Sequence, residues 1–101
     1  MTGKLVRDRI AEIMKESGKI PITRIASAEE YKQALKDKLL EEVREYMASG
    51  KLEEIADIME VIQCLIRVEG SDLETVEKIR KDKAGKRGGF EKGIILEGIG
   101  K

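Results

Sequence analysis

The sequence contains no histidine, one cysteine and only three aromatic residues among 101 residues. The absence of histidine excludes imidazole acid–base catalysis, histidine-containing triads and histidine-ligated metals. Cys64 alone cannot form an intrachain disulfide or a cysteine-rich zinc site. Any metal would therefore need oxygen ligands, and the core has to be built from aliphatic side chains.

The chain also lacks an excess of one charge and a long apolar run. Its 20 basic and 20 acidic side chains cancel, which argues against a dedicated nucleic-acid-binding protein. No segment reaches the roughly 18 apolar residues of a membrane span, and the first residues lack the apolar core of a signal peptide. We therefore expect one cytoplasmic domain over residues 1–101 that binds neither nucleic acid nor membrane.

Apolar periodicity and capping signals predict an all-α fold, a four-helix bundle-like subunit. In the second helix, Ser27 and Glu30 form a capping-box pattern. A glycine follows the end of each of the first three helices and provides a stop signal. The predicted spans are Lys4–Ser17, Ser27 to about Ala48, Leu52–Glu69 and Ser71 to about Lys86. Ser71 is the expected cap of the fourth helix. The glycine-rich tail after the fourth helix is expected to be irregular or a short β-strand.

Four acidic residues occupy unusual positions in the second and third helices. Helical spacing places Glu42 in the middle of an inward apolar stripe, and Glu54 within the wide apolar surface of the third helix. Glu45 and Asp57 lie at the edges of these surfaces, each three residues from its partner. Carboxylates buried together are costly unless a cation compensates them, and Mg²⁺ prefers such hard oxygen ligands. The alternative is that these acids are solvated surface charges, but the joint pattern favours a metal site.

The acidic residues belong to a longer pattern. The segment KLLEEVREY, followed by EEIAD, resembles the E-x-x-E…E-x-x-D signature of the all-α nucleoside triphosphate pyrophosphohydrolases. That superfamily contains the MazG-like proteins, the dimeric dUTPases and phosphoribosyl-ATP pyrophosphohydrolase. The flanking segments KLVRDRI (residues 4–10) and RGGFEKGIILE (residues 87–97) resemble a compact branch described as predicted house-cleaning pyrophosphatases, so the resemblance covers nearly the whole chain.

This resemblance implies a site and a reaction. Glu42, Glu45, Glu54 and Asp57 would coordinate one or two Mg²⁺ ions, with Mn²⁺ as a substitute. A nucleoside triphosphate, ordinary or damaged, would be hydrolysed between its α and β phosphates to a monophosphate and pyrophosphate. Either Glu41 or a metal ligand such as Glu42 would accept the proton. Base and sugar preference stay open.

A triphosphate also requires cations from the protein. Lys38, one turn before Glu42, is the best-placed candidate. Further substrate-binding candidates are Lys4 and Arg7 near the start of the chain, and Lys83 and Arg87 near its end. A basic last helical turn also suits the helix dipole without any ligand, so that alternative is kept for the last two.

The apolar surface of the third helix is wider than three partner helices in so short a chain can cover. Such surfaces usually form subunit interfaces, so we expect a homodimer or a dimer of dimers. The rival interpretation is a non-catalytic helical interaction or regulatory module that retains the fold, because a fold does not fix an activity.

Overall fold

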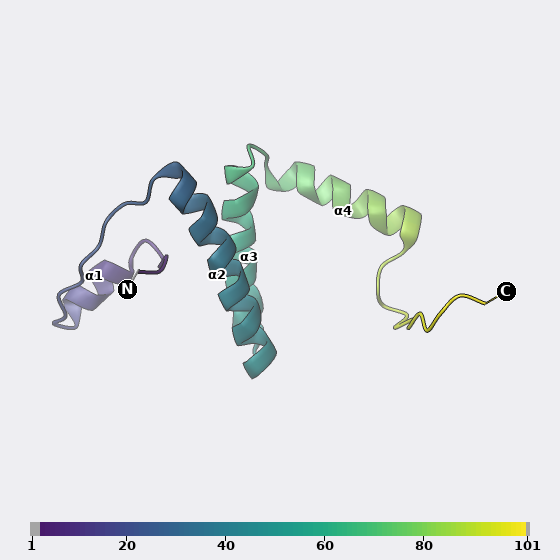
Figure 1. The fold of residues 1–101 in the computed structure, drawn as a ribbon, viewed down its shortest axis with the longest axis horizontal. Coiled ribbons are helices and arrows are strands. Elements are labelled where there is room, and N and C mark those ends of the chain that lie inside the picture. The colour runs from purple at the N-terminus through teal and green to yellow at the C-terminus, as the bar shows by residue number, and fades with distance from the viewer. Residues whose placement is uncertain (1–2, 101) are drawn as a thin grey trace.

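The structure, a computed structural model, describes residues 3–100 and contains four helices within them (Figure 1). They are α1 (Ile10–Glu16), α2 (Ala28–Ser49), α3 (Leu52–Val68) and α4 (Leu73–Arg87). Residues 3–100 include no strand, which confirms the predicted all-α class. The tail from 88 to 100 is irregular rather than β.

Local capping chemistry explains where α2 begins and ends. The Ser27 hydroxyl accepts a hydrogen bond from the Glu30 backbone N–H at 3.2 Å, as expected for an N-cap. Arg24 donates two hydrogen bonds to the Glu30 carboxylate, and the one from its Nη1 atom measures 2.6 Å. At the other end of α2, Gly50 adopts a left-handed φ of 66° and turns the chain sharply into α3.

The cap of α4 differs from the prediction by one residue. Asp72, not Ser71, is the N-cap, and its carboxylate accepts from the Thr75 backbone N–H at 2.7 Å. A charged acceptor makes a stronger hydrogen bond than a hydroxyl and also suits the positive end of the helix dipole. The Asp72 carboxylate, rather than the Ser71 hydroxyl, therefore caps α4.

The predicted start of the first helix at Lys4 is wrong, because α1 begins only at Ile10. The preceding residues run along α2 and α3, where the side chains of Lys4 and Arg7 form ion pairs with acids of those helices. These partners lie 37 and 50 positions further along the chain. The spacing of apolar residues within a short stretch of sequence cannot reveal pairs between residues so far apart.

The α2 and α3 helices form an antiparallel hairpin that contains the small core. Leu35 from α2 and Val61 and Ile66 from α3 are its buried apolar side chains. Within the described part of the chain, α4 contacts α3 alone among the helices, and α1 packs against no other helix. No helix in residues 3–100 is both long and apolar enough to cross a membrane.

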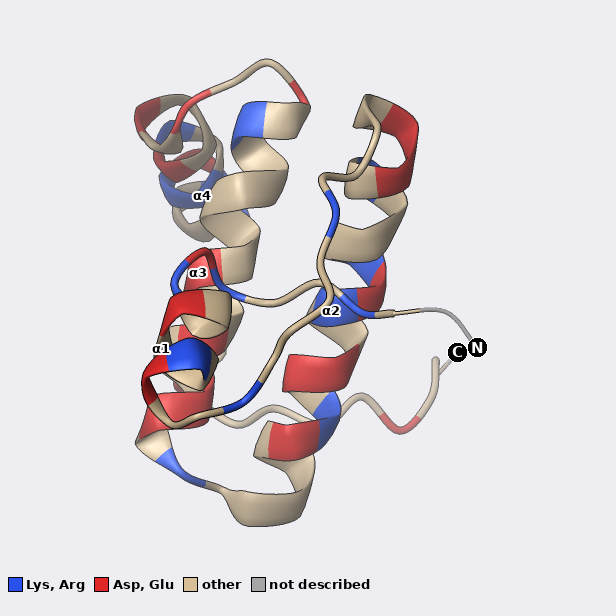
Figure 2. Ribbon diagram, turned by 90° about the vertical axis from the view of Figure 1, so that its left-hand side faces the viewer, with Lys and Arg blue, Asp and Glu red and all other residues tan. Residues whose placement is uncertain are grey.

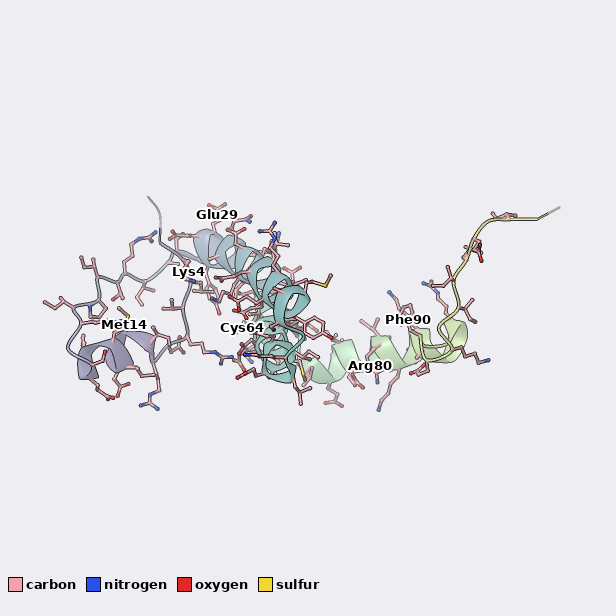
Figure 3. All side chains as sticks on the ribbon, turned by 90° about the horizontal axis from the view of Figure 1, so that it is seen from below. Lys4, Met14, Glu29, Cys64, Arg80 and Phe90 are labelled. Atoms are coloured by element: carbon pink, nitrogen blue, oxygen red, sulfur yellow. The ribbon has the colours of Figure 1, made fainter. Side chains whose placement is uncertain are left out.

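The resulting chain is elongated rather than bundled. Its longest extent is 64 Å and its radius of gyration is 18.3 Å, whereas a compact chain of this length would have a radius of about 13 Å. The N-terminal region and α4 extend from opposite sides of the hairpin, as Figures 1 and 3 show. Residues 3–100 therefore contain four helices that do not close into the predicted bundle.

Candidate functional site

Three carboxylates converge between the two helices of the hairpin. Glu42 on α2 and Glu54 and Asp57 on α3 each offer an oxygen atom, and these atoms lie within 4.8 Å of one another. The spacing of three residues puts Glu54 and Asp57 on one face of α3, and the tight Gly50 turn brings that face opposite Glu42. Acidic residues accordingly gather on both helices toward the loop that joins them (Figure 2).

Glu42 is the most unusual member of the group. It is only 6% exposed, and its Oε2 atom is buried without a hydrogen-bond partner among the described residues. Its Oε1 atom lies 3.5 Å from the Lys38 ammonium. Burial raises the pKa of the Glu42 carboxyl, and repulsion from Glu45 and Asp57 raises it further, while Lys38 opposes the shift. An orphaned anionic oxygen facing two other carboxylates fits the donor set of a divalent cation.

Glu45, the fourth predicted ligand, lies outside the converging group. Its side chain is exposed, although it is close enough to Glu42 to raise the pKa of that carboxyl. The spacing of three residues places Glu45 one turn further along α2, toward the loop that joins α2 and α3. Three of the four predicted ligands are thus brought together.

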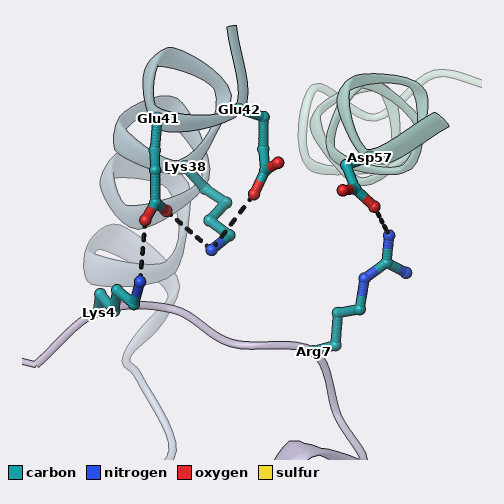
Figure 4. Close-up of polar contacts among 6 residues, drawn as sticks. All are labelled: Lys4, Arg7, Lys38, Glu41, Glu42 and Asp57. Carbon is teal, nitrogen blue, oxygen red and sulfur yellow. Dashed lines mark hydrogen bonds and ion pairs between the residues drawn. The ribbon is translucent and has the colours of Figure 1, made fainter. Parts of the chain in front are cut away.

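Basic side chains surround the acids, as Figure 4 shows. The ammonium groups of Lys38 and Lys4 donate to opposite oxygens of Glu41, at 2.8 and 2.9 Å, and together they lower the pKa of its carboxyl. Arg7 donates to Asp57 Oδ1 at 2.7 Å. The predicted candidates Lys4, Arg7 and Lys38 and the predicted catalytic Glu41 therefore all lie at this site.

A cavity of about 480 Å³ opens beside the acidic group. Its volume is within the range of about 300–1,000 Å³ that small-molecule sites occupy. The N-terminal segment forms one wall, and the hairpin forms the others. Four of the polar residues that line it are predicted site residues, namely Arg7, Lys38, Glu42 and Asp57. The others are Asp8, Arg9, Tyr31, Glu60, Cys64 and Arg67.

Sequence reasoning missed the part of this cavity that lies beyond Asp57. Cys64 and Arg67 continue along the same side of α3, and Arg67 donates to the Cys64 Sγ atom at 3.5 Å. Across the cavity, burial and the neighbouring Cys64 raise the pKa of the Tyr31 hydroxyl. Counting turns from Asp57 along α3 places Cys64 beside it, but the apolar helix around this thiol favoured inert packing. Of the N-terminal wall, Arg7 was among the predicted residues and Arg9 was not.

The last two predicted substrate-binding residues, Lys83 and Arg87, do not lie at the acidic site. They lie in the final turns of α4, and no residue from 68 to 100 lines the cavity. Figure 3 shows α4 leading away from Cys64 and Lys4 toward Phe90. The structure therefore does not bring Lys83 or Arg87 to the acidic group.

Comparisons with known proteins give no assignment of family. No protein-family model matches the chain, and no solved structure matches it. An uncharacterized protein of Mycolicibacterium smegmatis is 50% identical over 46 residues, which cover 46% of this chain. The matched region spans 47% of that relative, so the similarity extends over about half of each protein.

Proposed function

We propose that the protein hydrolyses a nucleoside triphosphate between its α and β phosphates in a Mg²⁺-dependent reaction. The single observation that supports this proposal most strongly is the convergence of Glu42, Glu54 and Asp57 around a buried carboxylate oxygen without a partner. The adjoining cavity, with Arg7 and Lys38 on its wall, has room for part of a nucleotide. The resemblance of the acidic pattern to the all-α pyrophosphohydrolases gives the reaction class.

Glu42, Glu54 and Asp57 would hold one Mg²⁺ ion, and Glu45 would contribute to a second. When bound, the metal neutralises phosphate charge and lowers the pKa of a coordinated water. Oxygen ligands of this kind suit Mg²⁺ and Mn²⁺ better than softer metals. The repulsion among these carboxylates is the reason they would favour a divalent cation over solvent.

The ion pairs of the site suggest how the protein's own side chains would exchange partners. Lys4 and Lys38 bind Glu41 in the free protein, and both would turn to the phosphates when a triphosphate enters. Loss of those two cations would raise the pKa of Glu41 toward its ordinary value and make it a better proton acceptor. Arg7 would likewise leave Asp57 for a phosphate once that carboxylate has a different cation.

The test is to incubate the protein with Mg²⁺ and a panel of ordinary, deoxy and damaged triphosphates and to assay pyrophosphate. We expect release from at least one substrate, and its loss in Glu42→Gln and in Asp57→Asn. Glu53→Gln is the matched control, because Glu53 is exposed on the same turn of α3 outside the converging group. Absence of pyrophosphate release from every substrate would favour the non-catalytic helical module.

A further inference from the structure

A short segment near the start of the chain closes one side of the cavity. We define residues 3–9 as the N-terminal strap. The strap contains no helix or strand, and its residues from Leu5 to Arg9 line the cavity. Among the described residues, it makes no backbone–backbone hydrogen bond to α2 or α3. Its side-chain hydrogen bonds to these helices are those of Lys4 and Arg7 (Figure 4).

The ion pairs that attach the strap are individually weak. The side chains of Arg7 and Asp57 are 57% and 36% exposed, and an ion pair at such a position shifts an equilibrium by about fivefold at most. Little else holds this part of the chain. Val6 is 41% exposed, and α1, which follows the strap, packs against no other helix among the described residues. A change at one or two side chains is therefore enough to release the strap.

Asp57 takes part in two groups at once. Its carboxylate accepts the hydrogen bond from Arg7 at 2.7 Å, and it also converges with Glu42 and Glu54. Arg7 contacts one of these carboxylates, whereas a divalent cation can be bound by all three, including the Glu42 oxygen that has no partner. Two cations on the same carboxylate also repel each other. Binding of a metal and binding of Arg7 at Asp57 therefore oppose each other.

The other basic side chains of the strap lack this connection. Arg9 lines the same cavity, but its guanidinium binds Glu12 of α1 at 3.2 Å. Lys4 binds Glu41, whose carboxylate is not in the converging group. Arg7 is thus the strap residue that couples the position of this segment to the charge of the acidic group.

We propose that the Arg7–Asp57 ion pair is a latch, which holds the strap over the cavity in the metal-free protein and opens when a divalent cation occupies the three carboxylates. Of its two ion pairs, the released strap keeps the one between Lys4 and Glu41. The cavity then becomes accessible to a triphosphate, so that metal binding precedes nucleotide binding. This inference rests on the metal site of the function proposed above and not on the hydrolysis.

The affinity for metal provides the first test. Coupling between two binding events is reciprocal, so a latch that metal opens must weaken metal binding by the factor with which it closes the strap. By calorimetric titration, Arg7→Gln should bind Mg²⁺ about twofold to fivefold more tightly than the wild-type protein. Arg9→Gln is the matched control, because it removes the same charge from the same wall of the cavity without touching the latch. Its affinity for Mg²⁺ should equal that of the wild type.

Cys64 reports the position of the strap without any assay of activity. It is the only cysteine of the chain, it is partly buried, and it lines the same cavity as the strap. A chromogenic aromatic disulfide should react with this thiol about twofold to fivefold faster in excess Mg²⁺ than in chelator, because the reagent enters when the strap is open. Arg7→Gln should react at the fast rate in both solutions, whereas Arg9→Gln should behave like the wild type.

The outcomes separate failure of the latch from failure of the proposed function. Wild-type protein that binds Mg²⁺ with no change in the reactivity of Cys64 would overturn the latch and leave the hydrolysis standing. A metal-dependent rise in reactivity without pyrophosphate release from any triphosphate would keep the latch and overturn the hydrolysis. Equal effects of Arg7→Gln and Arg9→Gln would reveal a general effect of charge and overturn the latch. A protein that binds no Mg²⁺ would overturn both.

Discussion

Replacing Glu42 by glutamine should stabilise the protein when no divalent cation is present. The substitution keeps the shape of the side chain and removes the charge from a site that is 6% exposed. A buried polar group without a partner costs about 1–3 kcal/mol, and more when it is charged. Since Lys38 at 3.5 Å compensates part of this cost, we expect the free energy of unfolding to rise by about 1–2 kcal/mol. In a domain of this size that corresponds to about 4–8 °C in the melting temperature for each kcal/mol.

The pH dependence of this gain has a definite sign. Because the pKa of Glu42 is raised in the folded protein, folding favours its protonated form. The wild-type protein therefore loses stability as the pH rises from the ordinary pKa of the carboxyl through its raised value in the fold. The advantage of Glu42→Gln should be small in acid and full near neutral pH.

Divalent cation should reverse the order of stability. A ligand present at 100 times its dissociation constant stabilises the folded state by about 2.7 kcal/mol. Wild-type protein should gain this from Mg²⁺, whereas Glu42→Gln should gain little. Circular dichroism melts in chelator and in excess Mg²⁺ measure both effects, with Glu53→Gln as the control. A variant that is less stable than wild type in chelator, or that gains equally from Mg²⁺, would refute the reasoning.

Three further perturbations test the fold around the site. Ser27→Ala removes the N-cap of α2 and should cost about 1 kcal/mol in urea unfolding; an unchanged midpoint would show that the cap is dispensable. Leu35→Ala, at a side chain that is 2% exposed, should cost about 2–5 kcal/mol in the same assay, and a cost of a few tenths would contradict its place in the core. Arg24 lowers the pKa of Glu30, so this pair contributes stability at neutral pH that is lost as the pH falls through the lowered pKa. Glu30→Gln should therefore flatten the acid limb of the stability profile, and an unaltered limb would argue against the pair.

The parts of the fold that the sequence predicts well are those with local causes. The boundaries of α2 depend on Ser27 and on the left-handed turn at Gly50, both of which are visible within a few residues. The inward direction of Glu42 and Glu54 follows from helical spacing alone. The shift of the α4 cap to Asp72 was a competition between adjacent residues, which a pattern of residue types resolves less well.

The parts that could not be predicted depend on contacts between distant segments. Lys4 and Arg7 precede α1 and pair with Glu41 and Asp57, and neither pairing has a periodic signal. The elongated shape of the chain was likewise hidden, because the number of helices and the apolar pattern do not specify which helices pack against one another. Lys83 and Arg87 were selected for their charge, and charge alone does not fix their place in space.

The most direct test of the carboxylate site is a crystal structure of the protein grown with Mn²⁺, with anomalous scattering measured at the manganese edge. A metal held by Glu42, Glu54 and Asp57 should give a peak about 2.0–2.2 Å from an oxygen of each of the three side chains. A map with no peak there, with manganese bound elsewhere or with the three carboxylates turned outward to solvent, would contradict the proposed metal centre.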